Sequence, residues 1–192
     1  LVALARHQSA EAQSAFNAVY GQVPGELAPK LALALACETG GEADVAESLY
    51  VICARTDATY IAPAAFGLAR VRAARGDVDG AVSALDLVPA TSRAFTQARR
   101  RRAGLLAESG AGLASLAAAL ESIDDLTIDP VDRSRFRVDV LQTALEIVES
   151  QGPDTTVWIA GRPAAEPELR DGLEAAYRDL AGYATSRDER VR

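Results

Sequence analysis

The sequence predicts an all-α fold in which helix pairs stack into a solenoid, and three observations indicate it. A small residue followed four positions later by a large one recurs at an interval of 34 and then 35 residues. A glycine-containing turn recurs in register with these pairs. About half of the chain is hydrophobic but only 5% is aromatic, which fits a helical core of Ala, Leu and Val. The recurring pairs are Ala12 and Phe16, Ala46 and Tyr50, and Ala81 and Leu85.

This spacing follows the tetratricopeptide repeat, a helix–turn–helix unit of 34 residues. A small residue at the start of the second helix lets the first helix of the pair approach closely, and a larger side chain would push the two apart. The residue four positions later lies on the same helical face and fills the space beside it. The alternative is chance coincidence in an alanine-rich helical bundle, since alanine is the best helix former.

The glycine-containing turns and the Leu-Ala dipeptides that precede them argue against coincidence. Leu68-Ala69 precedes Ala81 at the interval at which the repeat consensus has Leu-Gly, and Leu33-Ala34 precedes Ala46 at the same interval. Gly76-Asp77 then falls between two helices, as a C-terminal glycine followed by an N-cap aspartate should. Gly40-Gly41 holds the corresponding place in the preceding copy.

The repeats are expected to occupy residues 1–110. Residues 1–8 resemble the end of a first helix whose beginning is missing, so we expect the chain to begin inside a longer protein. Pro24-Gly25 separates the first two complete helices, and Thr91 or Ser92 is expected to cap the helix that follows Pro89. The predicted helices cover residues 10–22, 27–39, 43–56, 61–75, 79–88 and 93–109.

Beyond Gly110 the strict repeat fades, and residues 111–192 are expected to form further α-hairpins that continue the same domain. A single-face apolar stripe predicts a helix over 113–126. Asp129-Pro130 is expected to open a helix over 131–150, as N-cap and first-turn proline. Residues 151–167 hold three prolines, two glycines and the only tryptophan, which predicts a long loop. A last helix is expected over 167–184.

Composition excludes several classes of function. The net charge of −7 and the pI near 4.8 oppose nucleic-acid binding, which requires a basic surface. No apolar run approaches the roughly 20 residues that span a bilayer, and no cationic leader precedes an apolar segment. We therefore expect no membrane span and a soluble, cytoplasmic chain.

The sequence offers no catalytic constellation and gives no reason to expect a cofactor or a metal. His7 is the only histidine, and we expect it on the surface or at a helix end. Cys37 and Cys53 are expected to be buried, reduced thiols, since one pair makes neither a zinc site nor a disulfide framework. The aspartates at 124, 125 and 129 lack the spacing of a calcium loop. No Gly-rich phosphate loop or G-x-S-x-G motif occurs.

Four arginines at 99–102 form the most conspicuous charge run. On a helix they would fan out over all faces, so they cannot make one basic stripe. We expect a solvated helix whose arginines pair with local carboxylates while their stems cover apolar surface. The functional alternative is a docking site for an acidic partner segment.

Three stretches resemble the C-terminal tetratricopeptide domain of the actinobacterial serine/threonine protein kinase G family. They are residues 24–34 (PGELAPKLALA), residues 65–72 (AFGLARVR) leading to Gly76-Asp77, and residues 88–93 (VPATSR) followed by Phe95-Thr96. The last is specific, because PATSR is absent from the general repeat consensus. The resemblance is firm over 10–100 and looser over 130–184, where Gly172-Leu173-Glu174-Ala175 is similar.

In that family the domain follows a rubredoxin-like metal-binding segment and a kinase domain. The kinase phosphorylates a small forkhead-associated regulator of glutamate and 2-oxoglutarate metabolism. Neither upstream region matches any part of this chain, so no catalytic, nucleotide or metal residue is carried over to it. The resemblance implies a non-enzymatic regulatory domain whose partner is its own kinase domain, a second subunit or the forkhead-associated substrate. The alternative is a free-standing tetratricopeptide scaffold or the sensor arm of a transcriptional regulator.

The first helix of each repeat lines the concave face of such a solenoid. The lining positions are mostly apolar or small, which favours a hydrophobic contact with another domain or subunit over a basic clamp for an acidic peptide. The interaction residues predicted on this face are Leu31, Leu35, Glu38, Phe66 and Arg70, with Thr39, Ala73 and Ala74 in the same register.

Overall fold

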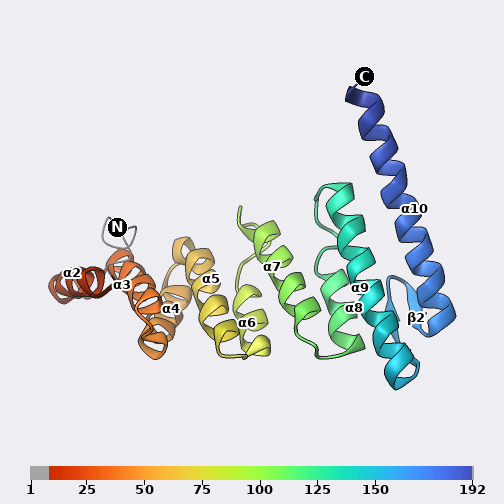
Figure 1. The fold of residues 1–192 in the computed structure, drawn as a ribbon. Coiled ribbons are helices and arrows are strands. Elements are labelled where there is room, and N and C mark those ends of the chain that lie inside the picture. Colours follow the sequence, from red (N-terminus) through yellow and green to blue (C-terminus); the bar gives the residue numbers. More distant parts are fainter. Residues whose placement is uncertain (1–8, 192) are drawn as a thin grey trace. The chain divides into compact units, whose positions relative to one another are not determined.

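The structure is a computed structural model in which residues 9–191 are described (Figure 1). Within this range the chain forms nine helices and one two-stranded sheet. It divides into two compact units, Leu1–Ala98 (unit 1) and Arg99–Arg192 (unit 2), which are described separately below. The division falls inside one helix, α7 (Phe95–Glu108). The boundary near residue 110, drawn where the repeat fades, stays a prediction.

Unit 1 is built from antiparallel helix pairs. Each helix packs on the next along the chain from α2 to α6, and α3 also contacts α5, the first helix of the following pair. This arrangement, visible from the red to the yellow helices of Figure 1, confirms the predicted stack of helix pairs. The helices are α2 (Ser9–Gln22), α3 (Leu27–Thr39), α4 (Ala43–Thr56), α5 (Ala58–Ala74), α6 (Val78–Leu85) and α7 (Phe95–Glu108), the last of which runs on into unit 2.

The small residues of the repeat lie where the helices approach each other. Ala12, Ala46 and Ala81 are each no more than 1% exposed. The large residues Tyr50 and Leu85 are buried as well, so both members of the second and third pairs belong to the core. Phe16, the large member of the first pair, is only half-buried. The pattern therefore predicted the burial of the other five residues, and the reason is close packing within each pair.

The turns have the predicted chemistry. Gly41 and Gly76 adopt φ values of +85° and +79°, which glycine reaches without steric cost. Asp77 follows at the N-cap of α6, where its Oδ1 accepts a hydrogen bond from the Gly80 N–H at 2.9 Å. Ser92, predicted to cap a helix from residue 93, accepts from the Ala94 N–H, but α7 begins only at Phe95, so Ser92 lies before the N-cap position. Glycine ends and polar caps thus fix where these helices stop and start.

Two predicted helix bounds in unit 1 are wrong by about a turn. α5 begins at Ala58 rather than at 61, because the Asp57 side chain caps it by accepting from the Thr59 N–H at 2.7 Å. α6 ends at Leu85 rather than at 88, and the following residues turn toward Pro89.

Unit 2 packs three helices and a hairpin around one core. Helix α8 (Leu113–Glu121) is shorter than the predicted 113–126, because the chain turns over 122–126. Asp129 caps α9 (Pro130–Gln151) through the Val131 N–H, as predicted. The last helix is α10 (Glu166–Val191). The core combines α8, α9, α10 and the hairpin, and its fully buried members include Leu141, Ala144, Ile159, Ala164 and Leu169.

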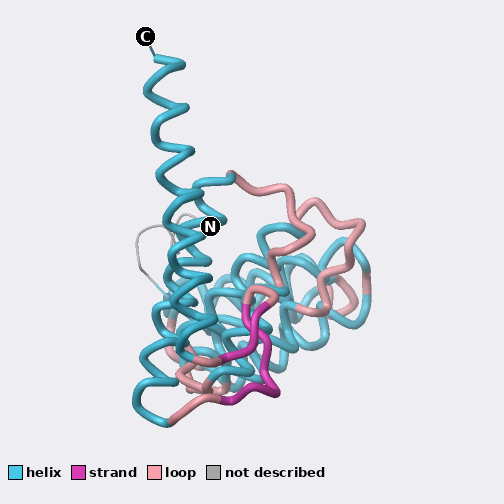
Figure 2. Tube along the Cα trace, turned by 90° about the vertical axis from the view of Figure 1, so that its right-hand side faces the viewer, coloured by secondary structure: helices cyan, strands magenta, loops and turns pink. Residues whose placement is uncertain are grey.

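The loop predicted over 151–167 is wrong in its central part, where β1 (Asp154–Ile159) and β2 (Arg162–Ala164) pair antiparallel (magenta in Figure 2). Residues 155–159 are β-branched or aromatic, which favours a strand. Ala160 and Gly161 form the two-residue turn with φ values of +52° and +78°, the signs that a type I′ turn requires. The prolines and glycines of the segment predict a loop, but they flank this short β-prone run rather than interrupt it.

The cysteine prediction is confirmed. Cys37 and Cys53 are buried and free, and burial raises the pKa of both thiols, which keeps them protonated. His7 and the helix expected over residues 1–8 lie outside the described residues. In the described part of the chain, no helix is long and apolar enough to cross a bilayer, and no group of three or more acidic, cysteine or histidine side chains is placed to hold a metal ion.

The arginine run pairs only in part as expected, because one arginine contacts a carboxylate and another contacts neutral oxygens. The Arg100 guanidinium lies 3.4 Å from the Asp132 carboxylate, and Arg102 donates to the Ala118 carbonyl and to the Ser122 hydroxyl. Both arginines thus contact unit 2 itself.

Candidate functional site

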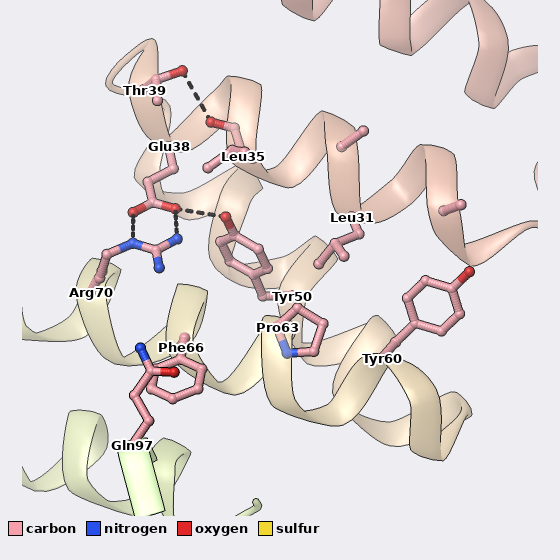
Figure 3. A pocket seen from close by; sticks show the side chains of 12 residues that line it. Leu31, Leu35, Glu38, Thr39, Tyr50, Tyr60, Pro63, Phe66, Arg70 and Gln97 are labelled. Carbon is pink, nitrogen blue, oxygen red and sulfur yellow. Dashed lines mark hydrogen bonds and ion pairs between the residues drawn. The ribbon is translucent and has the colours of Figure 1, made fainter. Parts of the chain in front are cut away.

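A groove of about 730 Å³ runs between α3 and α5 in unit 1, and we call it the α3–α5 groove (Figure 3). All of its lining residues lie in unit 1. Six come from α3: Ala28, Leu31, Ala32, Leu35, Glu38 and Thr39. Four come from α5: Tyr60, Pro63, Phe66 and Arg70. Tyr50 of α4 and Gln97 of α7 complete it.

Helical periodicity explains why these residues share one face. The α3 residues follow a spacing of three and four, and the α5 residues recur every three or four positions. The stripes extend over residues 28–39 and 60–70, or roughly 16 Å at about 1.5 Å per residue. The groove is therefore long enough for about five residues of extended peptide or three turns of helix.

The body of the groove is apolar. Leu31 and Leu35 project from α3 toward Pro63 and Phe66 on α5, while the Tyr50 ring lies between the two helices (Figure 3). Leu35 is 36% exposed. An exposed apolar surface of this kind is typical of a binding site.

One charge cluster stands at one end of the groove. Arg70 makes a two-pronged contact with Glu38, with Nε to Oε1 at 2.6 Å and Nη2 to Oε2 at 2.8 Å. The Tyr50 hydroxyl donates to the same Oε2 at 2.6 Å. Glu38 therefore receives three charge-assisted hydrogen bonds, which hold the three side chains in one arrangement.

The electrostatics follow from these bonds. Desolvation by burial raises the pKa of Glu38, but the hydrogen bonds from Arg70 and Tyr50 and the Arg70 charge together outweigh it and hold that pKa below its ordinary value. Burial, and then the hydrogen bond to Glu38, raise the pKa of Tyr50, and the hydrogen bond to Glu38 raises that of Arg70. At neutral pH the cluster is thus one carboxylate and one guanidinium, with no net charge.

A glycine makes the Tyr50 position possible. A Cβ atom added at Gly67 would lie 2.3 Å from Cζ of the Tyr50 ring, far inside contact distance. The glycine before Leu68 thus lets α5 approach the aromatic residue that the repeat places on α4. It also supports the hydroxyl position from which Tyr50 reaches Glu38.

The structure brings the predicted interaction residues together. Leu31, Leu35, Glu38, Phe66 and Arg70 all line the α3–α5 groove, together with Thr39. Whether they bind a partner stays a prediction. Ala73 and Ala74, in the same predicted register, do not line it.

Sequence reasoning missed six lining residues, among them Ala28 and Ala32 of α3. Tyr60 and Pro63 lie six and three positions before Phe66, so extending the same stripe toward the start of α5 would have found them. Tyr50 was recognised as a packing residue but not as a partner of Glu38. Gln97 follows the irregular segment around Pro89, where the repeat register is lost, and no sequence signal placed it.

This arrangement can bind but has little means to catalyse. Its carboxylate is engaged by an arginine and a tyrosine, and its lining residues include neither a cysteine nor a histidine. General acid–base catalysis needs a group poised to exchange a proton near neutral pH, and Glu38, with its lowered pKa, is not one. The groove has instead the apolar lining and the few oriented polar groups of a recognition surface.

Comparisons with known proteins agree with the repeat pattern. The family described as protein kinase G tetratricopeptide repeat matches residues 1–192. The serine/threonine-protein kinase PknG of Mycobacterium leprae (strain TN) is 36% identical over 189 residues, which are 94% of this chain and 24% of that protein. The protein of the same name from Mycolicibacterium smegmatis (strain ATCC 700084 / mc(2)155) is 37% identical over 180 residues, 91% of this chain and 23% of that protein.

The chain therefore spans about a quarter of the length of these curated relatives. The family match covers both units, including unit 2, most of whose sequence does not follow the strict repeat. Repeat spacing, helix pairing and these similarities lead to one assignment. The chain belongs to the protein kinase G tetratricopeptide repeat family.

Proposed function

We propose that this chain is a non-catalytic, regulatory protein-interaction domain of a serine/threonine protein kinase, and that it holds its partner in the α3–α5 groove. The observation that carries this proposal is the gathering of Leu31, Leu35 and Phe66 around one apolar groove on the face where repeat proteins bind. Such a surface gains free energy when a partner covers it, since each buried apolar side chain contributes roughly 1.5–3 kcal/mol.

The kinase part of the proposal rests on the relatives. Both are named serine/threonine-protein kinases, and this chain corresponds to about a quarter of each. Reading the coding sequence upstream of Leu1 tests this part directly. A Gly-rich loop, a strand lysine and a His-Arg-Asp catalytic loop are expected there. A winged-helix or ATPase motif in their place would contradict it and favour a regulator.

The resemblance to kinase G also supports a finer proposal. The kinase would phosphorylate a forkhead-associated regulator in the cytoplasm and so control glutamate and 2-oxoglutarate metabolism. This domain would serve it by packing on the kinase domain, by joining two subunits or by recruiting that substrate. All three roles require a protein contact, and the apolar α3–α5 groove offers a surface for one.

The test uses the full-length protein with Leu35→Asp, which places a charge in the groove at an exposed position. Ile52→Asp is the matched control, because Ile52 is 42% exposed on α4 and lies outside the groove. We measure phosphorylation of the forkhead-associated protein and of a short peptide, and solution mass by light scattering. Leu35→Asp should reduce phosphorylation of the protein substrate by about fivefold or more, or reduce the mass, and should leave the peptide reaction unchanged. Equal behaviour of both variants in all measurements would contradict the proposal.

A further inference from the structure

The charge cluster at the end of the α3–α5 groove has a consequence for what the groove accepts. Among the described residues that line the groove, Arg70 is the one cation; its side chain is 48% exposed, so by itself it would attract an acidic segment. Glu38 lies against it with a side chain that is only 18% exposed. The two-pronged contact leaves a lining with no net charge beside an apolar body.

We propose that Glu38 sets the specificity of this groove: it neutralises Arg70, so that the groove binds a protein segment with large apolar side chains and discriminates against an acidic one. This inference rests on the proposed function and names the chemistry of the partner. The segment presents two or three residues such as leucine or phenylalanine and carries no aspartate or glutamate beside them.

Charge complementarity supports this occupant. An acidic residue brought to Arg70 would also approach the Glu38 carboxylate, whose oxygens lie within 2.8 Å of the guanidinium nitrogens. The attraction and the repulsion then nearly cancel, while the acidic group still loses part of its hydration. An uncharged apolar side chain meets no such cost and gains contact with Leu31, Leu35 and Phe66.

Tyr50 fixes Glu38 in this role. Its hydroxyl donates to the oxygen that Arg70 Nη2 also contacts, and the buried ring holds that hydroxyl in place. The carboxylate cannot turn away to leave Arg70 free without losing both partners. The Glu38 carboxylate that neutralises Arg70 is thus held in place by a buried residue of unit 1.

The size of the groove agrees with a short segment. A volume of about 730 Å³ lies within the range of sites that enclose a ligand of several large groups. Its length of roughly 16 Å suits about five extended residues, of which alternate side chains would enter the groove. Three leucines separated by small polar residues therefore make a suitable probe.

The test measures binding of fluorescent peptides to the 192-residue chain by fluorescence anisotropy. The first peptide has three leucines separated by serines and blocked ends. In the second, serines replace the leucines. The third keeps the leucines but has two aspartates in place of spacer serines. We expect the wild-type chain to bind the leucine peptide about tenfold or more tightly than the serine peptide, and more tightly than the acidic peptide.

The decisive variant is Glu38→Gln, which keeps the shape of the side chain, removes its charge and leaves one acceptor oxygen in place of two. It should bind the acidic peptide about fivefold more tightly than wild type does, and the leucine peptide as wild type does. Glu47→Gln is the matched control. Glu47 pairs with Arg72 and Arg75 outside the groove, so this variant changes the net charge equally but should leave all three affinities unchanged.

Adding Arg70→Gln to Glu38→Gln should abolish the gain, which assigns it to the freed guanidinium. The inference is overturned if wild type binds the leucine peptide no better than the serine peptide, or if wild type prefers the acidic peptide. It is also overturned if Glu38→Gln and Glu47→Gln have the same peptide affinities while both keep the wild-type circular dichroism spectrum. These peptide affinities are independent of the phosphorylation and mass measurements. Failure of the inference and failure of the proposed function are therefore distinguishable.

Discussion

Gly67 shows how one residue without a side chain can determine the geometry of a binding surface. Tyr50 packs directly over it, and the Tyr50 side chain is buried. The ring position in turn sets the reach of the Tyr50 hydroxyl to Glu38. A glycine inside a helix usually costs stability, so its presence at this point of α5 has a packing reason.

Replacing Gly67 with alanine should destabilise the chain by about 1–3 kcal/mol, because the new Cβ atom would overlap the Tyr50 ring and force it or α5 to shift. Urea denaturation followed by circular dichroism measures the change. Gly104→Ala serves as the control in a helix interior, since its nearest obstruction is Glu108 Oε1 at 3.9 Å. That variant should be neutral or gain up to about 1 kcal/mol. Equal losses in both variants would show that Tyr50 is not the cause.

Glu38 should also give unit 1 a stability that depends on pH. Its pKa is lowered in the folded chain, so the folded state favours the ionised carboxylate more than the unfolded state does. The contribution is complete above the ordinary pKa of a glutamate and is lost as the pH falls through the lowered pKa.

The difference in unfolding free energy between wild type and Glu38→Gln is therefore expected to stay constant from pH 8 to about pH 5 and to shrink at lower pH. Urea titrations at several pH values measure this difference in unfolding free energy. The same titrations of Glu47→Gln are the control and show how strongly the loss of another carboxylate depends on pH. A difference that grows on acidification would contradict the assigned direction of the Glu38 shift.

At the scale of the elements, sequence and structure agree best where several local signals coincide. The helices over 27–39 and 43–56 have their predicted bounds, because Gly40 and Gly41 end the first helix and begin the turn to the second. The predicted 113–126 helix is too long, since apolar periodicity continues through residues 122–126 although the backbone already turns. Periodicity identifies a buried face but does not distinguish the last helical turn from a turn packed on the same core.

The groove illustrates the same limit. Positions on α3 and α5 could be predicted from the repeat period, since the same face of each first helix recurs at a fixed interval. The hydrogen bond between Tyr50 and Glu38 could not, because it depends on how closely α4 and α5 approach across Gly67. The contribution of Gln97 depends on the path of residues 86–94, which have no regular structure to predict.

The β1–β2 hairpin carries a conformational cost at its turn. Ala160 adopts φ +52°, where its Cβ atom crowds the backbone, and it is the one non-glycine residue with positive φ among residues 9–191. Ala160→Gly should stabilise unit 2 by about 0.5–1 kcal/mol, because glycine adopts this conformation without the clash. Thermal denaturation measures the effect. Ala111→Gly is the control in an exposed loop of the same unit and should not stabilise, so a similar gain there would refute the argument.

The whole molecule consists of two compact units, and each has buried residues of its own. Leu68 is 2% exposed within unit 1, and Leu141 is fully buried in the core of unit 2. In repeat architectures each helix contacts mainly its neighbours along the chain, so stability is a sum of local contributions. Damage to one core should then remain largely within its own unit, although α7 runs through the division between them.

Leu141→Ala and Leu68→Ala should each cost about 2–5 kcal/mol in the unit concerned, because each leaves a cavity in a packed core. Amide hydrogen exchange read peptide by peptide separates the two units. Leu141→Ala should lower protection in α9 and α10 and spare α3, α4 and α5, whereas Leu68→Ala should do the reverse. The α3–α5 groove would then keep its peptide affinity in Leu141→Ala. Equal loss of protection throughout the chain in both variants would instead show that the two units unfold as one, in which case α7 couples the groove to the core of unit 2.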